Sequence, residues 1–211
     1  MYNKAIKGRV RLIVASTKME RELHKQGSIL VAGIDEVGRG ALAGPLVAAC
    51  VILPSNCRLT LADSKLLLPK TRAAISRRIQ TTAIGFGLGW VSNQEIDEFG
   101  LSWSLQEAYV RALEDMALEV SQIILDGSIN YLKEFDICQT LIKADQSVSC
   151  VAAASIIAKV ARDEYMQSLH EQYPQYYYQT NVGYGTPAHR AALKEHGLTD
   201  LHRKSFCSNL V

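Results

Sequence analysis

The chain has 211 residues, of which 48% are hydrophobic and 21% charged, with 14 Gly and 5 Pro. This composition excludes a disordered, collagen-like or low-complexity chain and fits one packed domain with room for a small appendage. The formal net charge of +2 neither identifies nor excludes a nucleic-acid-binding protein. The charge is unevenly distributed, because residues 1–28 hold seven basic and two acidic residues and the remainder is slightly acidic.

Apolar runs and cysteine spacing indicate the cellular compartment. The longest clean apolar run covers residues 46–53, whereas a membrane span needs about 20 residues. The first residues lack the apolar core and cleavage site of a secretory signal. The five cysteines are odd in number and form no C-x-x-C pair, which indicates reduced thiols rather than a disulfide framework or a zinc site. We therefore expect a cytoplasmic protein without a membrane partner.

The predicted elements alternate between strands and helices along the chain. A basic segment at residues 1–28, with weak helical character at residues 19–25, comes first. Apolar runs predict strands at residues 28–35, 46–53, 83–91, 122–126 and 140–143. Helical spacing predicts helices at residues 69–82, 104–120 and 148–170, and a last helix from Pro187 to Gly197. This order predicts an α/β fold of three layers with a helical C-terminal portion.

Several local patterns add detail to this outline. Residues 83–91 alternate bulky side chains with Gly85, Gly87 and Gly89, which predicts a strand with one bare face that other backbone can approach closely. The alanine-rich start of residues 148–170 predicts close packing on the sheet. Residues 92–95 form a capping-box pattern, and residues 186–187 form a Thr-Pro helix start.

Four acidic residues, Asp35, Glu36, Asp126 and Asp145, stand where strands end or helices begin. Any one of them alone is adequately explained as a turn former or a helix cap, and Asp145 fits a cap best. As a set they indicate more, because parallel neighbouring strands bring their carboxyl ends together at one sheet edge, where ligands of open α/β sheets bind.

Clustered carboxylates repel one another, and such a cluster persists when protons or cations fill it. Oxygen ligands without nearby His or Cys indicate Mg²⁺ or Mn²⁺, and two such ions can clamp a phosphodiester displacement. Adjacent strand residues point to opposite faces. We therefore expect Asp35 and Glu36 to share a site only if the chain turns there, which Gly38 and Gly40 permit.

The segment GRGALAG at residues 38–44 matches the G-x-G-x-x-A dinucleotide fingerprint. That fingerprint must open a helix, whereas here Pro45 and a strand-like run follow, so we reject it. A glycine turn beside carboxylates, carrying Arg39, instead offers bare backbone groups to a ligand. The alternative is a tight connection between strands with a solvated Arg39.

Eight segments together resemble the ribonuclease HII family. They are IDEVGRG (34–40), AGPLVAACVIL (43–53), DSK (63–65), LDG (125–127), IKAD with ASIIAKVARD (142–145 and 154–163), GYGT (183–186) and HRKSF (202–206). The resemblance implies a ribonuclease H fold, with a central mixed five-stranded sheet flanked by helices and a small helical C-terminal subdomain. It divides the chain into the N-terminal segment 1–28, a catalytic domain at 29–170 and a C-terminal portion at 171–211 that completes the substrate site.

The same resemblance implies an endonuclease that cuts the RNA strand of RNA–DNA hybrids. It also implies nicking of duplex DNA on the 5′ side of an embedded ribonucleotide, which leaves a 3′-hydroxyl and a 5′-phosphate. The cofactor implied is Mn²⁺ or Mg²⁺. The partners are the hybrid and the ribonucleotide-containing duplex, and we expect the protein to act as a monomer.

Site roles follow by motif position. Asp35, Glu36 and Asp126 would be metal ligands, with Asp145 as the fourth carboxylate. The turn at residues 38–40, with Gly38, Arg39 and Gly40, would contact the 2′-hydroxyl and the adjacent phosphate, and Tyr184 would pack on the sugar.

Three cations remain candidates for phosphate contacts: Lys65, Lys159 and Arg162. For each of them the alternative is a solvated loop or helix face. The sequence departs from the family pattern at Val182 and Leu66, where lysines are common, and at Ala41 and Ala144. Fewer basic side chains would weaken phosphate contacts.

Two other functions are alternatives. A protein of this fold could bind hybrids without cutting them; the presence of all four acids argues against this, and a nuclease assay with Mn²⁺ or Mg²⁺ separates it from an enzyme. A structural cation-binding protein would bind no hybrid at all, and it leaves the glycine turn unexplained.

Overall fold

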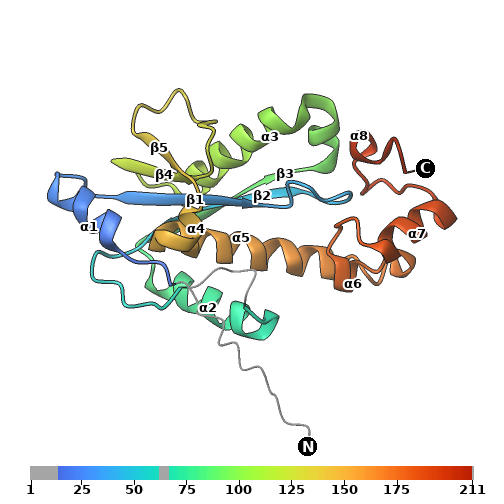
Figure 1. Ribbon diagram of the computed structural model, residues 1–211, viewed down its shortest axis with the longest axis horizontal. Coiled ribbons are helices and arrows are strands. Elements are labelled where there is room, and N and C mark those ends of the chain that lie inside the picture. The colour runs from blue at the N-terminus through green and yellow to red at the C-terminus, as the bar shows by residue number, and fades with distance from the viewer. Residues whose placement is uncertain (1–13, 62–66, 211) are drawn as a thin grey trace, which may run out of the picture.

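The computed structural model describes residues 14–61 and 67–210, and within them five strands form one mixed sheet (Figure 1). The strand order is β3-β2-β1-β4-β5. Strand β1 pairs antiparallel with β2 and parallel with β4; β2 pairs antiparallel with β3, and β4 parallel with β5. The strands are β1 Val31–Val37, β2 Leu46–Ile52, β3 Gly85–Val91, β4 Gln122–Asp126 and β5 Cys138–Leu141. The predicted mixed five-stranded sheet is confirmed.

Helices cover both faces of the sheet (Figure 1). Helix α5 packs on β1 and β2 with α2 against it, whereas α3 covers β2 and β3 on the opposite face. The long helices are α1 Lys18–Lys25, α2 Pro69–Thr82, α3 Asn93–Met116, α5 Ser149–Ser168 and α7 Pro187–His196. The short ones are α4 Ala144–Ser147, η2 Pro174–Tyr176, α6 Tyr178–Asn181 and α8 Lys204–Cys207. No helix within the described ranges is long and apolar enough to cross a membrane.

Three details of the predicted outline were wrong. Helix α3 begins at Asn93 rather than 104, because the capping box at Ser92 starts it and Gly100, at φ +79°, interrupts it with a kink. The apolar spacing becomes regular only after that kink. Strand β5 lies two residues earlier than expected. The helix that begins at Pro187 and ends at Gly197 is followed by α8, so it is not the last one.

Glycines allow the helices to lie directly on the sheet, as the bare-face pattern predicted. A Cβ atom on Gly87 or Gly89 would overlap the backbone carbonyls of Ala112 and Ala108 in α3. On the other face, a Cβ atom on Gly33 would overlap the α5 backbone at Cys150. Both helices therefore contact the sheet at the closest possible distance, which fixes where their side chains stand relative to the strand ends.

The C-terminal portion is attached to the connection between β1 and β2. Isolated bridges join Ala41 to Tyr184 and Ala43 to His202. Together with α6, α7 and α8, this portion lies beyond the end of the sheet (Figure 1). It therefore stands next to the point where β1 delivers its acidic residues.

Candidate active site

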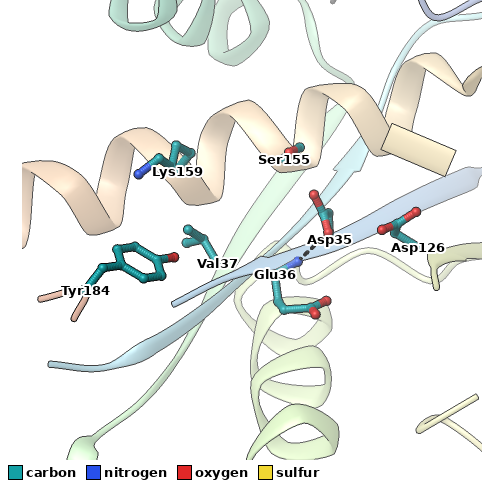
Figure 2. Close-up of a pocket in the computed structure, with 7 residues that line it drawn as sticks. All are labelled: Asp35, Glu36, Val37, Asp126, Ser155, Lys159 and Tyr184. Atoms are coloured by element: carbon teal, nitrogen blue, oxygen red, sulfur yellow. Dashed lines mark hydrogen bonds between the residues drawn. The ribbon is translucent and has the colours of Figure 1, made fainter. Parts of the chain in front are cut away.

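Three of the predicted acids meet at the end of β1 and β4. Asp35 and Glu36 lie within β1, which continues to Val37 opposite Val47 of β2. The pairing of β1 with β4 ends at Ile34 and Leu125, so Asp126 stands beside the next residue of β1. The expected turn at Glu36 was wrong: the chain stays extended, and the two side chains point to opposite faces of the sheet (Figure 2). They share a site because β4 ends at Asp126 and leaves the edge of β1 uncovered there.

These acids line a cavity of about 420 Å³, named the carboxylate cavity below. Figure 2 shows Asp35 directed toward α5 and Glu36 toward α3, with Asp126 beside them. The lining residues are Asp35, Glu36, Val37, Asp126, Ser155, Lys159 and Tyr184. A smaller cavity of about 160 Å³ on the α3 side shares Glu36 and Asp126. These two carboxylates can therefore be reached from both sides of the sheet.

Burial makes the ionised forms of these acids unfavourable. Desolvation raises the pKa of Asp35 well above its usual value, and the charges of Glu36 and Asp126 raise it further, while a hydrogen bond with Ser155 opposes the rise. Desolvation also raises the pKa of Glu36, against the hydrogen bond from Tyr109 and the charge of Arg39. A bound cation would stabilise the charged forms of both groups.

Hydrogen bonds hold each carboxylate in a defined orientation. The Tyr109 hydroxyl donates to Glu36 Oε2 over 2.6 Å, and the Ala144 N–H donates to Asp126 Oδ1 over 2.6 Å. The Glu36 N–H donates to Asp35 Oδ1 over 2.8 Å. The oxygens that remain open toward the cavity are therefore fixed in position before any ligand arrives.

The donor set fits a hard divalent cation, because it consists of carboxylate oxygens. The pKa is raised for two of the three carboxyl groups, Asp35 and Glu36. Among the residues that the structure describes, no three His, Cys, Asp or Glu side chains are close enough to form a ready-made metal cage. The oxygens line an open cavity instead, as expected of a site that must also admit a substrate.

Asp145 lies in α4, next to the residue that binds Asp126. It is the second residue of α4, is 5% exposed, and does not line the carboxylate cavity. Its neighbour Ala144 supplies the N–H that binds Asp126. The alternative interpretation of Asp145 as the cap of the long helix was wrong, because Val148 is the N-cap residue of α5.

Tyr184 lines the carboxylate cavity at the end away from Asp126 (Figure 2), and the glycine turn lies behind it. Gly38 has φ +89°, and a Cβ atom there would overlap the Arg162 side chain, so only glycine fits. Its N–H donates to the Tyr184 hydroxyl over 3.1 Å. Arg39 is half-exposed, and a Cβ atom on Gly40 would meet no atom within 4 Å. The turn is therefore accessible to a ligand at Arg39 and Gly40, while the Tyr184 hydroxyl holds it in place at Gly38.

The three candidate cations have different environments. Lys159 lines the cavity and forms an ion pair with Asp163 over 2.5 Å. The predicted phosphate role of Arg162 was wrong, because this side chain is fully buried and donates to the carbonyls of Ala43, Pro45 and Val182. Lys65 lies outside the described residues.

Sequence reasoning missed two residues of the site, Ser155 and Tyr109. Ser155 lies one helical turn before Lys159, and a single polar residue in the run VAAASIIA was a usable signal. Tyr109 carries no such signal, because it falls at the same helical spacing as the buried Leu105 and Ala112.

Comparisons with known proteins bear on the family and the fold of the chain. The family model described as Ribonuclease HII matches residues 32–209. A ribonuclease HII of Desulfotalea psychrophila is 45% identical over 89% of this chain and 85% of its own length. One of Geobacillus thermodenitrificans is 44% identical over 90% of this chain and 73% of its own length. Among solved structures, the ribonuclease H2 of Pyrococcus horikoshii OT3 matches with a TM-score of 0.74 at 24% identity, covering 86% of this chain and 97% of that one.

Proposed function

This chain belongs to the ribonuclease HII family, and we propose that the carboxylate cavity is where it carries out its reaction. The chain is an endonuclease of the type 2 ribonuclease H class and acts on the RNA strand of RNA–DNA hybrids. Nicking of duplex DNA at embedded ribonucleotides is the accompanying function of the family. We place the cut on the 5′ side of the ribonucleotide.

One observation carries this proposal: carboxylates from both faces of β1 and from the end of β4 converge on one cavity, where burial raises the pKa of Asp35 and Glu36. The family is dependent on divalent metal ions, and we propose Mn²⁺ or Mg²⁺ held by Asp35, Glu36 and Asp126. A cation bound there would supply electrostatic stabilisation of the charge on the scissile phosphate. Asp145 supports this group of carboxylates from its position in α4, where the N–H of its neighbour Ala144 orients Asp126.

The Tyr184 end of the cavity fits the recognition of a ribonucleotide. The 2′-hydroxyl is the group that distinguishes RNA from DNA, and it both donates and accepts hydrogen bonds. The Gly38 carbonyl and the Gly40 backbone can bind it without reading a base, since the Gly38 N–H already donates to Tyr184, while Arg39 and Lys159 contact the flanking phosphates. Tyr184 packs on the sugar, so that residues 171–211 complete the substrate site as a C-terminal portion.

The Asp126→Asn variant tests this assignment. We expect it to lose nicking of a duplex with one embedded ribonucleotide, in Mg²⁺ and in Mn²⁺, while its circular dichroism and thermal unfolding stay close to wild type. The exposed Asp136→Asn variant is the matched control and should cleave normally. Full activity of Asp126→Asn would overturn the assignment, and tight hybrid binding without any cutting by the wild type would identify a binding protein instead.

A further inference from the structure

Two buried imidazoles lie outside the carboxylate cavity, and the reaction described above does not use them. His189 of α7 is 0% exposed and His202 is 1% exposed. Their Nε2 atoms are 3.1 Å apart, which is a hydrogen-bond distance. The Tyr176 ring is tilted against the His202 ring, with the ring centroids 4.9 Å apart, and it stacks on the Tyr178 ring. Aromatic side chains therefore enclose the two imidazoles.

The backbone determines where the protons of this pair reside. The Thr199 N–H lies 2.9 Å from His202 Nδ1, and because a backbone N–H can only donate, Nδ1 must accept. A neutral His202 ring therefore carries its proton on Nε2. His189 Nδ1 lies 2.9 Å from the Tyr184 carbonyl oxygen, and because a carbonyl can only accept, this Nδ1 carries the proton of His189.

The two assignments are mutually consistent. His189 Nε2 is left as an acceptor and faces the Nε2–H of His202. The result is one directed chain of hydrogen bonds that begins at the Thr199 N–H, passes through His202 and His189, and ends at the Tyr184 carbonyl. The Thr199 hydroxyl also contacts His202 Nδ1 at 2.8 Å. The Tyr178 hydroxyl lies 3.3 Å from His202 Nε2.

The chain of hydrogen bonds exists only when both rings are neutral. A second proton on His202 would face the Thr199 N–H, and one on His189 would face the Nε2–H of His202. In either case two hydrogens would oppose each other at a donor-to-donor contact. Burial lowers the pKa of both rings, so both are neutral near pH 7.

The chain of hydrogen bonds ends at Tyr184, one of the residues that line the carboxylate cavity. The backbone carbonyl of Tyr184 is held by His189, and the hydroxyl of the same residue accepts from the Gly38 N–H. The Tyr184 carbonyl also accepts from the Thr186 N–H over 2.8 Å, so His189 is the side-chain partner of this carbonyl. The Tyr184 ring lies between the carbonyl and the Gly38 turn, beside Lys159.

We propose that His189 and His202 are positioning residues that fix Tyr184 against the Gly38 turn and so determine how closely the site fits a ribonucleotide. The proposal rests on the proposed function in one respect, namely that Tyr184 contacts the substrate sugar. The hydrogen-bond chain itself and its single pair of tautomers do not depend on that role.

The tautomers can be measured without any catalytic assay. Long-range ¹H–¹⁵N spectra of the full ¹⁵N-labelled chain at pH 7, without metal, report which ring nitrogen of each histidine carries the proton. We expect the Nε2–H tautomer for His202 and the Nδ1–H tautomer for His189. The same tautomer in both rings, or a charged ring, would overturn the proposal even if the protein cleaves hybrids as expected.

Two substitutions at one position separate positioning from general stability. In His189→Asn the amide nitrogen replaces Nδ1 and can still donate to the Tyr184 carbonyl. In His189→Gln the amide oxygen replaces Nε2 and accepts from His202, but the side-chain donor to the Tyr184 carbonyl is lost and only the Thr186 N–H remains. For a duplex with one ribonucleotide we expect the KM of His189→Gln to rise by roughly fivefold to tenfold, as for one lost hydrogen bond, with kcat much less affected and with a smaller KM increase for His189→Asn.

The Gly38 amide resonance gives a readout that does not need substrate. We expect its chemical shift to change in His189→Gln and to change less in His189→Asn. His196 lies on the same helix but takes no part in these hydrogen bonds, so His196→Gln should leave the Gly38 chemical shift unchanged. Equal KM values and an unmoved Gly38 amide in both His189 variants would refute the proposal. If the two His189 variants show the same rise in KM and the same falls in kcat and Tm, the two histidines have a purely structural role. If neither variant folds, the tautomers of the wild type decide.

Discussion

The two ends of the carboxylate cavity are built in different ways. The carboxylate end, with Asp35, Glu36 and Asp126, is positioned by strand pairing, and its charges are buried next to like charges. The tyrosine end, with Gly38 and Tyr184, is positioned by side chains that reach backbone groups far away in the sequence. Buried charge destabilises the first end, whereas hydrogen bonds to the backbone hold the shape of the second.

The most severe test of this contrast removes charge at the carboxylate end. In Asp35→Asn we expect cleavage to fall by roughly 100-fold or more, while the metal-free protein becomes as stable as wild type or more stable at pH 7. The reason is that the neutral amide avoids both desolvation of a charge and repulsion by Glu36. Nicking rates and thermal unfolding provide the two measurements. A large drop in Tm would show that Asp35 holds the fold together rather than the chemistry.

The second test removes a buried cation behind the tyrosine end. Arg162 donates to three carbonyls, and Arg162→Met would leave them without these donors in the protein interior. We expect the free energy of unfolding to fall by about 3 kcal/mol or more. Denaturant titration measures it, with the exposed Arg78→Met as the matched control. A loss no greater than that of the control would contradict the role assigned to Arg162.

Lowering the pH should act on the two ends in opposite directions. Desolvation lowers the pKa of His202 from 6.5 to about 4, so its contribution to stability is complete above pH 6.5 and is lost as the pH falls toward 4. The pKa of Asp35 is raised by burial, so the stability that its charge removes is recovered as the pH falls through that raised value. The titratable groups against His202 are His189, whose pKa is lowered in the same way, and Tyr176 and Tyr178.

Thermal unfolding between pH 7 and pH 4 checks both signs. At pH 7 we expect wild type to be more stable than His202→Asn and no more stable than Asp35→Asn. Both differences should shrink toward pH 4, because His202 gains its proton and Asp35 becomes neutral. Differences that stay constant across this range would show that neither group is coupled to folding in the way that its burial implies.

The mildest test concerns a hydrogen bond at the carboxylate end. The bond from Tyr109 lowers the pKa of Glu36 against its burial, so Tyr109→Phe should make Glu36 harder to ionise. We expect the Mg²⁺ or Mn²⁺ concentration for half-maximal cleavage to rise by about threefold to tenfold near pH 7, as for the net contribution of one ordinary hydrogen bond. Tyr131→Phe, whose ring lies 6.3 Å from that of Tyr109, serves as control. An unchanged metal requirement would remove Tyr109 from the site.

The same contrast explains what could be predicted from the sequence. Asp35 and Asp126 each follow an apolar run, so local pattern alone predicted where they stand, and parallel pairing brought them together. The extension of β1 through Glu36 was not visible, because it depends on pairing with β2 beyond the end of β4. Local sequence also gives no sign that Arg162 is buried, since a cation on a helix usually faces solvent.

The hydrogen-bond chain at the tyrosine end was equally invisible. His189 and His202 are 13 positions apart, and neither is marked by its neighbours as a partner of the other. Their meeting depends on the way that the C-terminal portion folds back on the connection after β1. Residues whose roles arise from such long-range contacts require the three-dimensional structure.

Arg203 supports the Gly38 turn and is synthesised long after it. Its buried side chain donates to the carbonyls of Gly44 and Arg39, on both sides of residues 40–43. Because a ribosome makes the chain from its N-terminus, all strands of the sheet and all four acids are synthesised before Arg203 appears. A nascent chain that stops short of this residue carries the carboxylates but lacks the support behind the turn. Under the proposed function, the part of the site that selects ribonucleotides is therefore completed after the carboxylates have been synthesised.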